Sequence, residues 1–76
     1  MDCRRELARA YGLLDLRLRA LVHHSVAAAF GRPFDYFPVE GPRRAREVLE
    51  GALGRRLAAL VMRELEALGA RGCLPV

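Results

Sequence analysis

Residues 30–42 read FGRPFDYFPVEGP, and this stretch divides the chain into two helical halves. Two prolines and two glycines lie between residues 31 and 41. Proline cannot continue a helix because it lacks an N–H and its ring clashes with the preceding turn, and glycine commonly ends helices. We therefore predict a connection over residues 31–41, too long for a tight turn. Its aromatic residues are expected to fold back over the open end of the helices, with a recognition patch as the alternative. These aromatic residues are Phe30, Phe34, Tyr36 and Phe37.

The half before this connection has the pattern of one long helix, from about residue 2 to residue 30. Asp2 is a good N-cap, and Gly31 followed by Pro33 is a strong stop signal. Apolar residues recur at alternating steps of four and three, which is typical of a helix that packs lengthwise on another helix. This seam consists of Leu7, Tyr11, Leu14, Leu18, Leu21, Ser25 and Ala28.

The half after the connection predicts a second helix, from about residue 42 to residue 68. Pro42 suits the first position of a helix, where its missing N–H costs nothing. Gly51 and Gly54 lie inside this segment and indicate a close helix crossing, with a local break near residue 51 as the alternative. The apolar stripe consists of Leu49, Leu53, Leu57, Leu60, Val61, Leu65 and Leu68.

Together the two segments predict one all-α domain over residues 1–76, an antiparallel hairpin of two long helices. Each helix also carries apolar residues opposite its main stripe, which a hairpin leaves in water. Leaving each large side chain exposed forgoes about 1.5–3 kcal/mol. We therefore expect a four-helix bundle completed by a second copy or by a partner protein, with the homodimer favoured. The predicted interface consists of Leu13, Leu16, Ala20, Val48, Ala59 and Met62.

This pattern favours a non-enzymatic protein-interaction or assembly module, such as an adaptor or a small subunit of a complex. A net charge of +4 allows an alternative, a small basic dimer that binds nucleic acid or has a regulatory role. Arginines at the two helix starts are the candidate anion or phosphate contacts, since free N–H groups and guanidinium groups bind phosphate together. They are Arg4, Arg5, Arg43, Arg44 and Arg46. Neighbouring glutamates favour a neutralised, solvated surface over such a site.

The remaining reactive side chains indicate no catalytic, metal or cofactor site. His23 and His24 point about 100° apart on a helix, whereas a helical metal pair needs a spacing of three or four residues. Asp35 or Glu40 could pair with one of them for acid–base chemistry, but no nucleophile accompanies them. We therefore expect no enzyme.

Cys3 and Cys73 fall at the same end of a hairpin, where a bridge between them is feasible. The longest largely apolar stretch, residues 20–30, is too short to span a membrane, and the N-terminal sequence does not resemble a secretory signal. We therefore expect an intracellular protein, cytoplasmic by default with a nuclear location left open. Free thiols follow from that expectation, because disulfides are rare in the cytosol.

Overall fold

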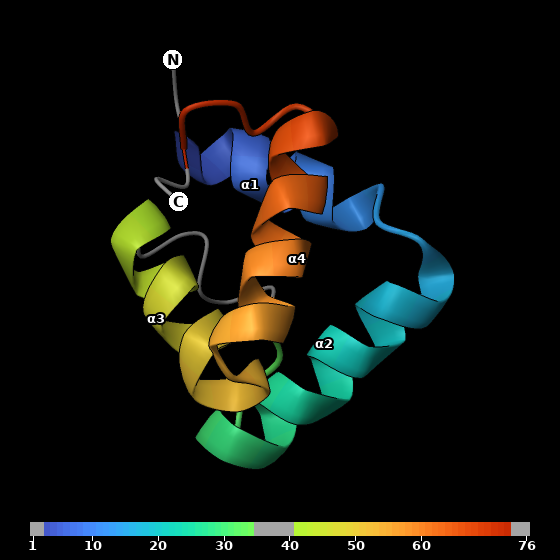
Figure 1. The fold of residues 1–76 in the computed structure, drawn as a ribbon, viewed down its shortest axis with the longest axis vertical. Helices are drawn as coiled ribbons and strands as arrows, with labels where there is room; N and C mark the ends of the chain where they lie inside the picture. Colours follow the sequence, from blue (N-terminus) through green and yellow to red (C-terminus); the bar gives the residue numbers. More distant parts are fainter. Residues whose placement is uncertain (1–2, 35–40, 74–76) are drawn as a thin grey trace.

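The computed structural model describes residues 3–34 and 41–73, and this part of the chain is helical without any strand (Figure 1). The prediction of an all-α chain is thus confirmed. The number of helices differs, because each long helix expected from the sequence is divided into two. The helices are α1 (Cys3–Gly12), α2 (Leu16–Phe30), α3 (Pro42–Leu53) and α4 (Arg55–Ala67).

The first expected helix is interrupted at residues 13–15, which corrects the prediction of a continuous helix over residues 2–30. At the end of α1, the N–H groups of Leu13 and Leu14 donate to carbonyls three residues back. The Asp15 carboxylate then accepts hydrogen bonds from the N–H groups of Arg17 and Leu18, at 3.1 and 3.4 Å. This is an N-cap, and it begins α2 in a new direction.

The second expected helix, over residues 42–68, is likewise wrong as a continuous element, because it turns at Gly54. Gly54 ends α3 and begins α4, with φ 82° and ψ 165°. This backbone region is essentially restricted to glycine, so the residue acts as a hinge point between two helices. Gly51 remains helical, and a Cβ there would lie 3.0 Å from the Phe30 ring of α2. One glycine of the pair thus makes the break and the other permits a close helix approach.

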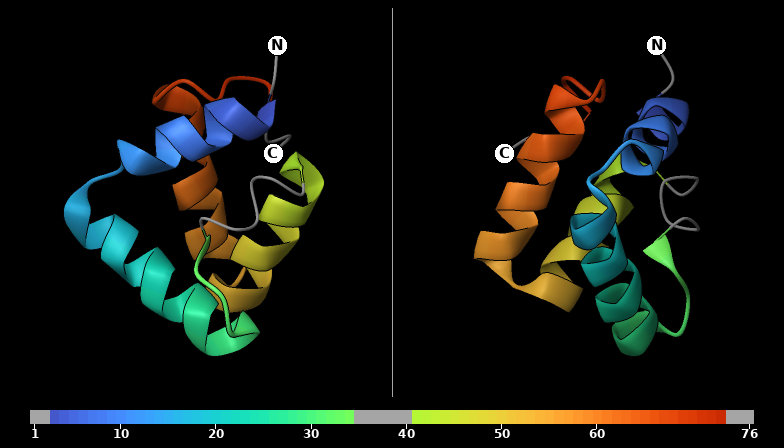
Figure 2. Two further views of the ribbon diagram at one scale, coloured as in Figure 1. Left: turned by 180° about the vertical axis from the view of Figure 1, so that it is seen from behind. Right: turned by 90° about the vertical axis from the view of Figure 1, so that its right-hand side faces the viewer.

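The helices form two layers instead of a hairpin (Figures 1 and 2). In the rear view α1, α2 and α3 form the sides of an open triangle, and the side view shows α4 as a second layer across it. The main packing pairs are α2 with α3 and α3 with α4, and α1 contacts both α3 and α4. The two halves of the sequence are therefore interleaved in space.

A single copy of the chain encloses a core. The radius of gyration is 10.7 Å, close to the value of about 11 Å for a compact chain of this length. Phe34, after the end of α2, is fully buried and its ring packs on Tyr11, with centroids 4.8 Å apart. Phe30, also expected to cover the helix ends, is 37% exposed, and Tyr36 and Phe37 lie outside the described residues. The largest buried side chains are Phe34, Leu7, Leu49, Leu65, Val22, Val26, Val48 and Val61.

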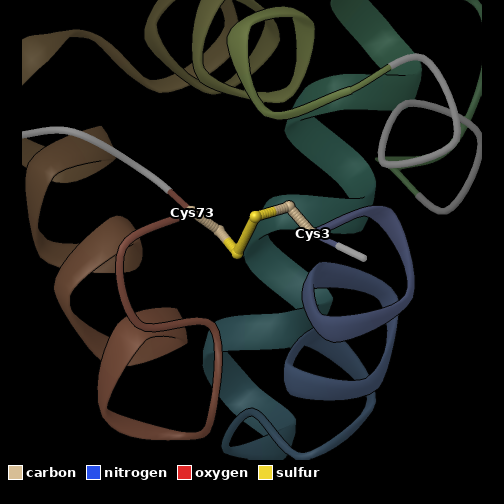
Figure 3. Close-up of a disulfide and its surroundings, with 2 residues drawn as sticks. All are labelled: Cys3 and Cys73. Atoms are coloured by element: carbon tan, nitrogen blue, oxygen red, sulfur yellow. A yellow bond between two sulfur atoms is a disulfide. The ribbon is translucent and has the colours of Figure 1, made fainter. Parts of the chain in front are cut away.

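A disulfide between Cys3 and Cys73 joins the start of α1 to the turns that follow α4 (Figure 3). The two Cα atoms are 5.4 Å apart, within the usual range for a disulfide. The expectation of free thiols is therefore wrong, whereas the placement of the two cysteines at the same end of the fold is confirmed. The bond attaches α1 covalently to the chain segment that leaves α4.

Candidate functional site

Most residues of helix α2 are apolar, yet few of them are buried. Its only charged residues are Arg17 and Arg19, and only Val22 and Val26 are fully enclosed by the rest of the chain. A helix that is apolar on all sides is ordinarily a buried one. The exposed side of α2 is therefore the first place in the described structure to look for a binding surface.

An open groove lies in the angle between α1 and α2 and has a volume of about 470 Å³. Leu16 lines it and is 69% exposed, and the neighbouring Leu13 is 58% exposed. Small residues form much of the remaining floor, so the groove has room for side chains of another molecule. Its lining consists of Ala8, Tyr11, Gly12, Leu16, Arg19, Ala20, His23 and His24.

Hydrogen bonds hold the two walls of the groove at a defined angle. The Arg19 Nη1 atom donates to the carbonyl oxygen of Gly12 at 2.9 Å, which satisfies an orphan acceptor at the end of α1. The Tyr11 hydroxyl donates to the carbonyl oxygen of Arg19 at 3.4 Å. Together with the Asp15 cap, these contacts connect the last turn of α1 to the first turns of α2.

Arginine predominates among the charged residues of the two helices that form the groove. Residues 3–34, which include both walls, contain six arginines but only two acids, Glu6 and Asp15. The Asp15 carboxylate caps α2. Glu6 is half-buried, and its Oε2 lies 3.9 Å from the position of a Cβ added to Gly69, so it is directed toward the end of α4. Among the described residues, none that lines the groove is acidic.

The structure separates the six residues expected at a partner interface. Leu16 and Ala20 line the α1–α2 groove and are exposed, and Leu13 is exposed in the turn between the two helices. Val48 and Met62 are instead buried in the chain's own core, with 0% and 2% of their surface exposed. Because α3 and α4 turn at Gly54 and pack on each other, Val48 and Met62 belong to the core of a single copy. Ala59 is half-buried beside a second, more polar cavity between α3 and α4.

The apolar seam predicted for the first half of the chain also changes its helical phase at residues 13–15. Leu7, Tyr11 and Leu14 are buried as expected, but Leu21 and Ala28 are exposed, and Val22 and Val26 replace them in the core. Because α2 starts afresh at Asp15, the helical phase of α1 does not carry through. The pair Gly12 and Asp15 is a helix stop followed by an N-cap, and that signal could have identified the break and the groove.

The five arginines at helix starts do not form one cluster of free cations. Arg44 contacts Glu47 and Arg46 contacts Glu50, each at 3.5 Å on the surface of α3. The Arg44 guanidinium also lies over the Phe30 ring, 5.8 Å from its centroid. Arg4 and Arg5 of α1 and Arg43 of α3 are exposed. Two of the five are thus in ion pairs within their own helix.

The histidines are exposed side chains on the groove wall. The His23 and His24 rings meet edge to face, with centroids 5.5 Å apart. In the described parts of the chain, no group of three or more potential ligands is arranged to hold a metal ion. Asp35 and Glu40, the carboxylates considered as their partners, lie outside the described residues.

Comparison of the chain with protein families, with curated proteins and with solved structures gave no match. Within residues 3–34 and 41–73, no helix combines the length and apolar character that a membrane crossing requires.

Proposed function

We propose that this protein is a non-enzymatic protein-interaction module that binds its partner through the α1–α2 groove. The observation that carries the proposal is the state of α2, a mostly apolar helix with only two fully buried residues. Leu13 and Leu16 stand at the turn where the two walls meet, and both have most of their side-chain surface in water.

The energetics favour a partner at this turn over chance exposure. Single exposed leucines are common on protein surfaces, but these two adjoin an open groove whose walls are held by hydrogen bonds. Covering each leucine contributes up to about 1.5–3 kcal/mol. A pre-formed groove also lowers the ordering cost of binding. An adaptor or a small subunit of a complex fits this arrangement.

The alternative of a basic nucleic-acid-binding protein gains no specific support. It requires free arginines in one place, and Arg44 and Arg46 are in ion pairs with glutamates of α3. Phosphate contacts also leave Leu13 and Leu16 without a function. This alternative stays a prediction. It would be supported by nucleic-acid binding whose affinity falls steeply as salt concentration rises.

The disulfide bears on where the module works. Disulfides persist in oxidising compartments and are rare in the cytosol, and the Cys3–Cys73 bond joins the two ends of the described fold. We propose an oxidising compartment in place of the cytoplasm expected from the sequence. Thiol labelling of protein taken directly from its source, with and without prior reduction, tests this assignment.

The interaction proposal is tested with the substitution Leu16→Glu. Leu16 is exposed, so the free energy of unfolding should stay within about 0.5 kcal/mol of the wild-type value. Light scattering over a protein concentration series detects a second copy, and titration with labelled amphipathic-helix peptides detects a different partner. We expect Leu16→Glu to weaken whichever association the wild-type protein shows by at least tenfold.

Leu60→Glu is the matched control, because Leu60 is 47% exposed on α4 and does not line the groove. It introduces the same charge at a similar exposure and should leave association unchanged. Equal effects of the two substitutions would contradict the assigned surface. A wild-type monomer that binds no amphipathic helix of either charge would contradict the function itself.

A further inference from the structure

We propose that the occupant of the α1–α2 groove is an acidic amphipathic helix, with apolar residues on one stripe and carboxylates beside it. This inference rests on the proposed function and specifies its partner. Three properties of the groove carry it: its apolar floor, the predominance of arginine among the charged residues of its two helices, and the hydrogen-bond donors along one wall.

The floor requires apolar side chains from the partner. Leu16 and Ala20 of α2 face Ala8 of α1 across the groove, and Leu13 stands at the turn between the helices. Helix-in-groove recognition places residues i, i+3, i+4 and i+7 of a partner into such a channel. On α2 the groove lining runs from Leu16 to His24, which at 1.5 Å per residue is about 13 Å and matches about two to three turns of a bound helix.

The walls require carboxylates from the partner. Arg19 lines the groove, and Arg17 of α2 and Arg9 of α1 are exposed residues of the two helices that form its walls. One nitrogen of Arg19 binds the Gly12 carbonyl oxygen, and a guanidinium has further N–H donors that can engage a carboxylate. The exposed imidazoles of His23 and His24 add N–H donors on the same wall.

The same charges disfavour a second copy. A two-fold dimer through this groove places identical surfaces against each other, so arginines of one copy would face arginines of the other. The groove lining carries no acid to pair with them in the described chain. The exposed leucines in turn disfavour a nucleic-acid backbone, which offers phosphates but no apolar stripe.

The test uses the intact, disulfide-bonded protein and two labelled peptides of about 18 residues. Both carry leucines at one helical stripe; one has glutamates beside the stripe and the other has lysines. Fluorescence anisotropy measures binding at low and moderate salt. We expect the leucine–glutamate peptide to bind at least tenfold more tightly than the leucine–lysine peptide, with an affinity that falls as salt rises.

Reversing the charge of two arginines on the groove-forming helices tests the electrostatic part of the proposal directly. In the double variant Arg9→Glu, Arg17→Glu, the glutamate peptide should lose at least tenfold in affinity and the lysine peptide should gain. The matched control is Arg55→Glu, Arg56→Glu, two exposed residues at the start of α4 that change the net charge equally. This control should leave the order of the two peptides unchanged.

The outcomes separate the inference from the proposed function. Equal binding of both peptides, lost in Leu16→Glu, would overturn the acidic partner while supporting an interaction groove. A stable wild-type dimer broken by Leu16→Glu would also overturn it, in favour of a second copy. Binding of neither peptide by a monomer would overturn both proposals. Tighter binding to a single-stranded oligonucleotide than to the glutamate peptide would indicate the nucleic-acid alternative.

Discussion

At the scale of single residues, glycines decide where helices end and how closely they approach. Gly31 ends α2 in the left-handed conformation, with φ 76°, and its N–H donates to the carbonyl oxygen of Ala27. This stop was predicted from the sequence. Gly54 has a different task, because its φ and ψ turn the chain between α3 and α4 without any side-chain cap.

Gly54→Ala should lower the free energy of unfolding by about 1–3 kcal/mol, because the backbone conformation is nearly exclusive to glycine. An added Cβ would meet no atom within 4 Å, so a loss can be assigned to the backbone alone. Gly12→Ala is the control: it also has open space but no positive φ. We expect it to leave stability unchanged or to raise it by up to about 1 kcal/mol. Urea denaturation of both variants measures the difference, and equal effects would contradict the argument.

At the scale of elements, α2 contributes both to the core of the fold and to the proposed binding groove. Val22 and Val26 are buried in the core and α2 packs mainly on α3, whereas Leu16 and Ala20 of the same helix line the groove. The orientation of α2 relative to α1 depends on residues 13–15, where the helical phase restarts. A continuous helix over residues 2–30 would have no such groove.

Asp15→Ala should remove the cap of α2 and cost about 1 kcal/mol of stability. Asp15→Asn keeps a side-chain oxygen that can accept from the Arg17 and Leu18 N–H groups, and should retain most of that stability. Thermal denaturation compares the two, and amide hydrogen exchange in the first turn of α2 should increase only in the alanine variant. A loss of equal size in Asp15→Asn would show that the charge matters more than the hydrogen bonds.

At the scale of the whole molecule, the disulfide and the core act together. The bond links residues separated by 70 positions in the sequence, so it restricts almost the entire unfolded chain. In a fold of 76 residues, a core alone supplies only a few kcal/mol of stability. Cys73 is buried against the core, and the bond holds α1 at the end of α4.

Reduction of this bond should destabilise the protein by up to about 4 kcal/mol, the chain-entropy value for a loop of this size. Urea denaturation of the wild-type protein with and without reductant measures the effect. The double variant Cys3→Ala, Cys73→Ala should resemble the reduced protein and should not respond to reductant. An oxidised wild type that is no more stable than the double variant would contradict a stabilising role.

The sequence by itself determined the helical class, the stop at Gly31 and the start of α3 at Pro42, because these depend on local backbone chemistry. It also identified Leu13 and Leu16 as apolar residues outside the main stripe. Only the tertiary structure decided that Val48 and Met62 belong to the core while Leu13 and Leu16 do not. A helical wheel assumes an unbroken helix, and the breaks at residues 13–15 and at Gly54 reset the phase of the elements that follow. Which apolar side faces a neighbour depends on those two turns, and therefore on contacts between distant parts of the chain.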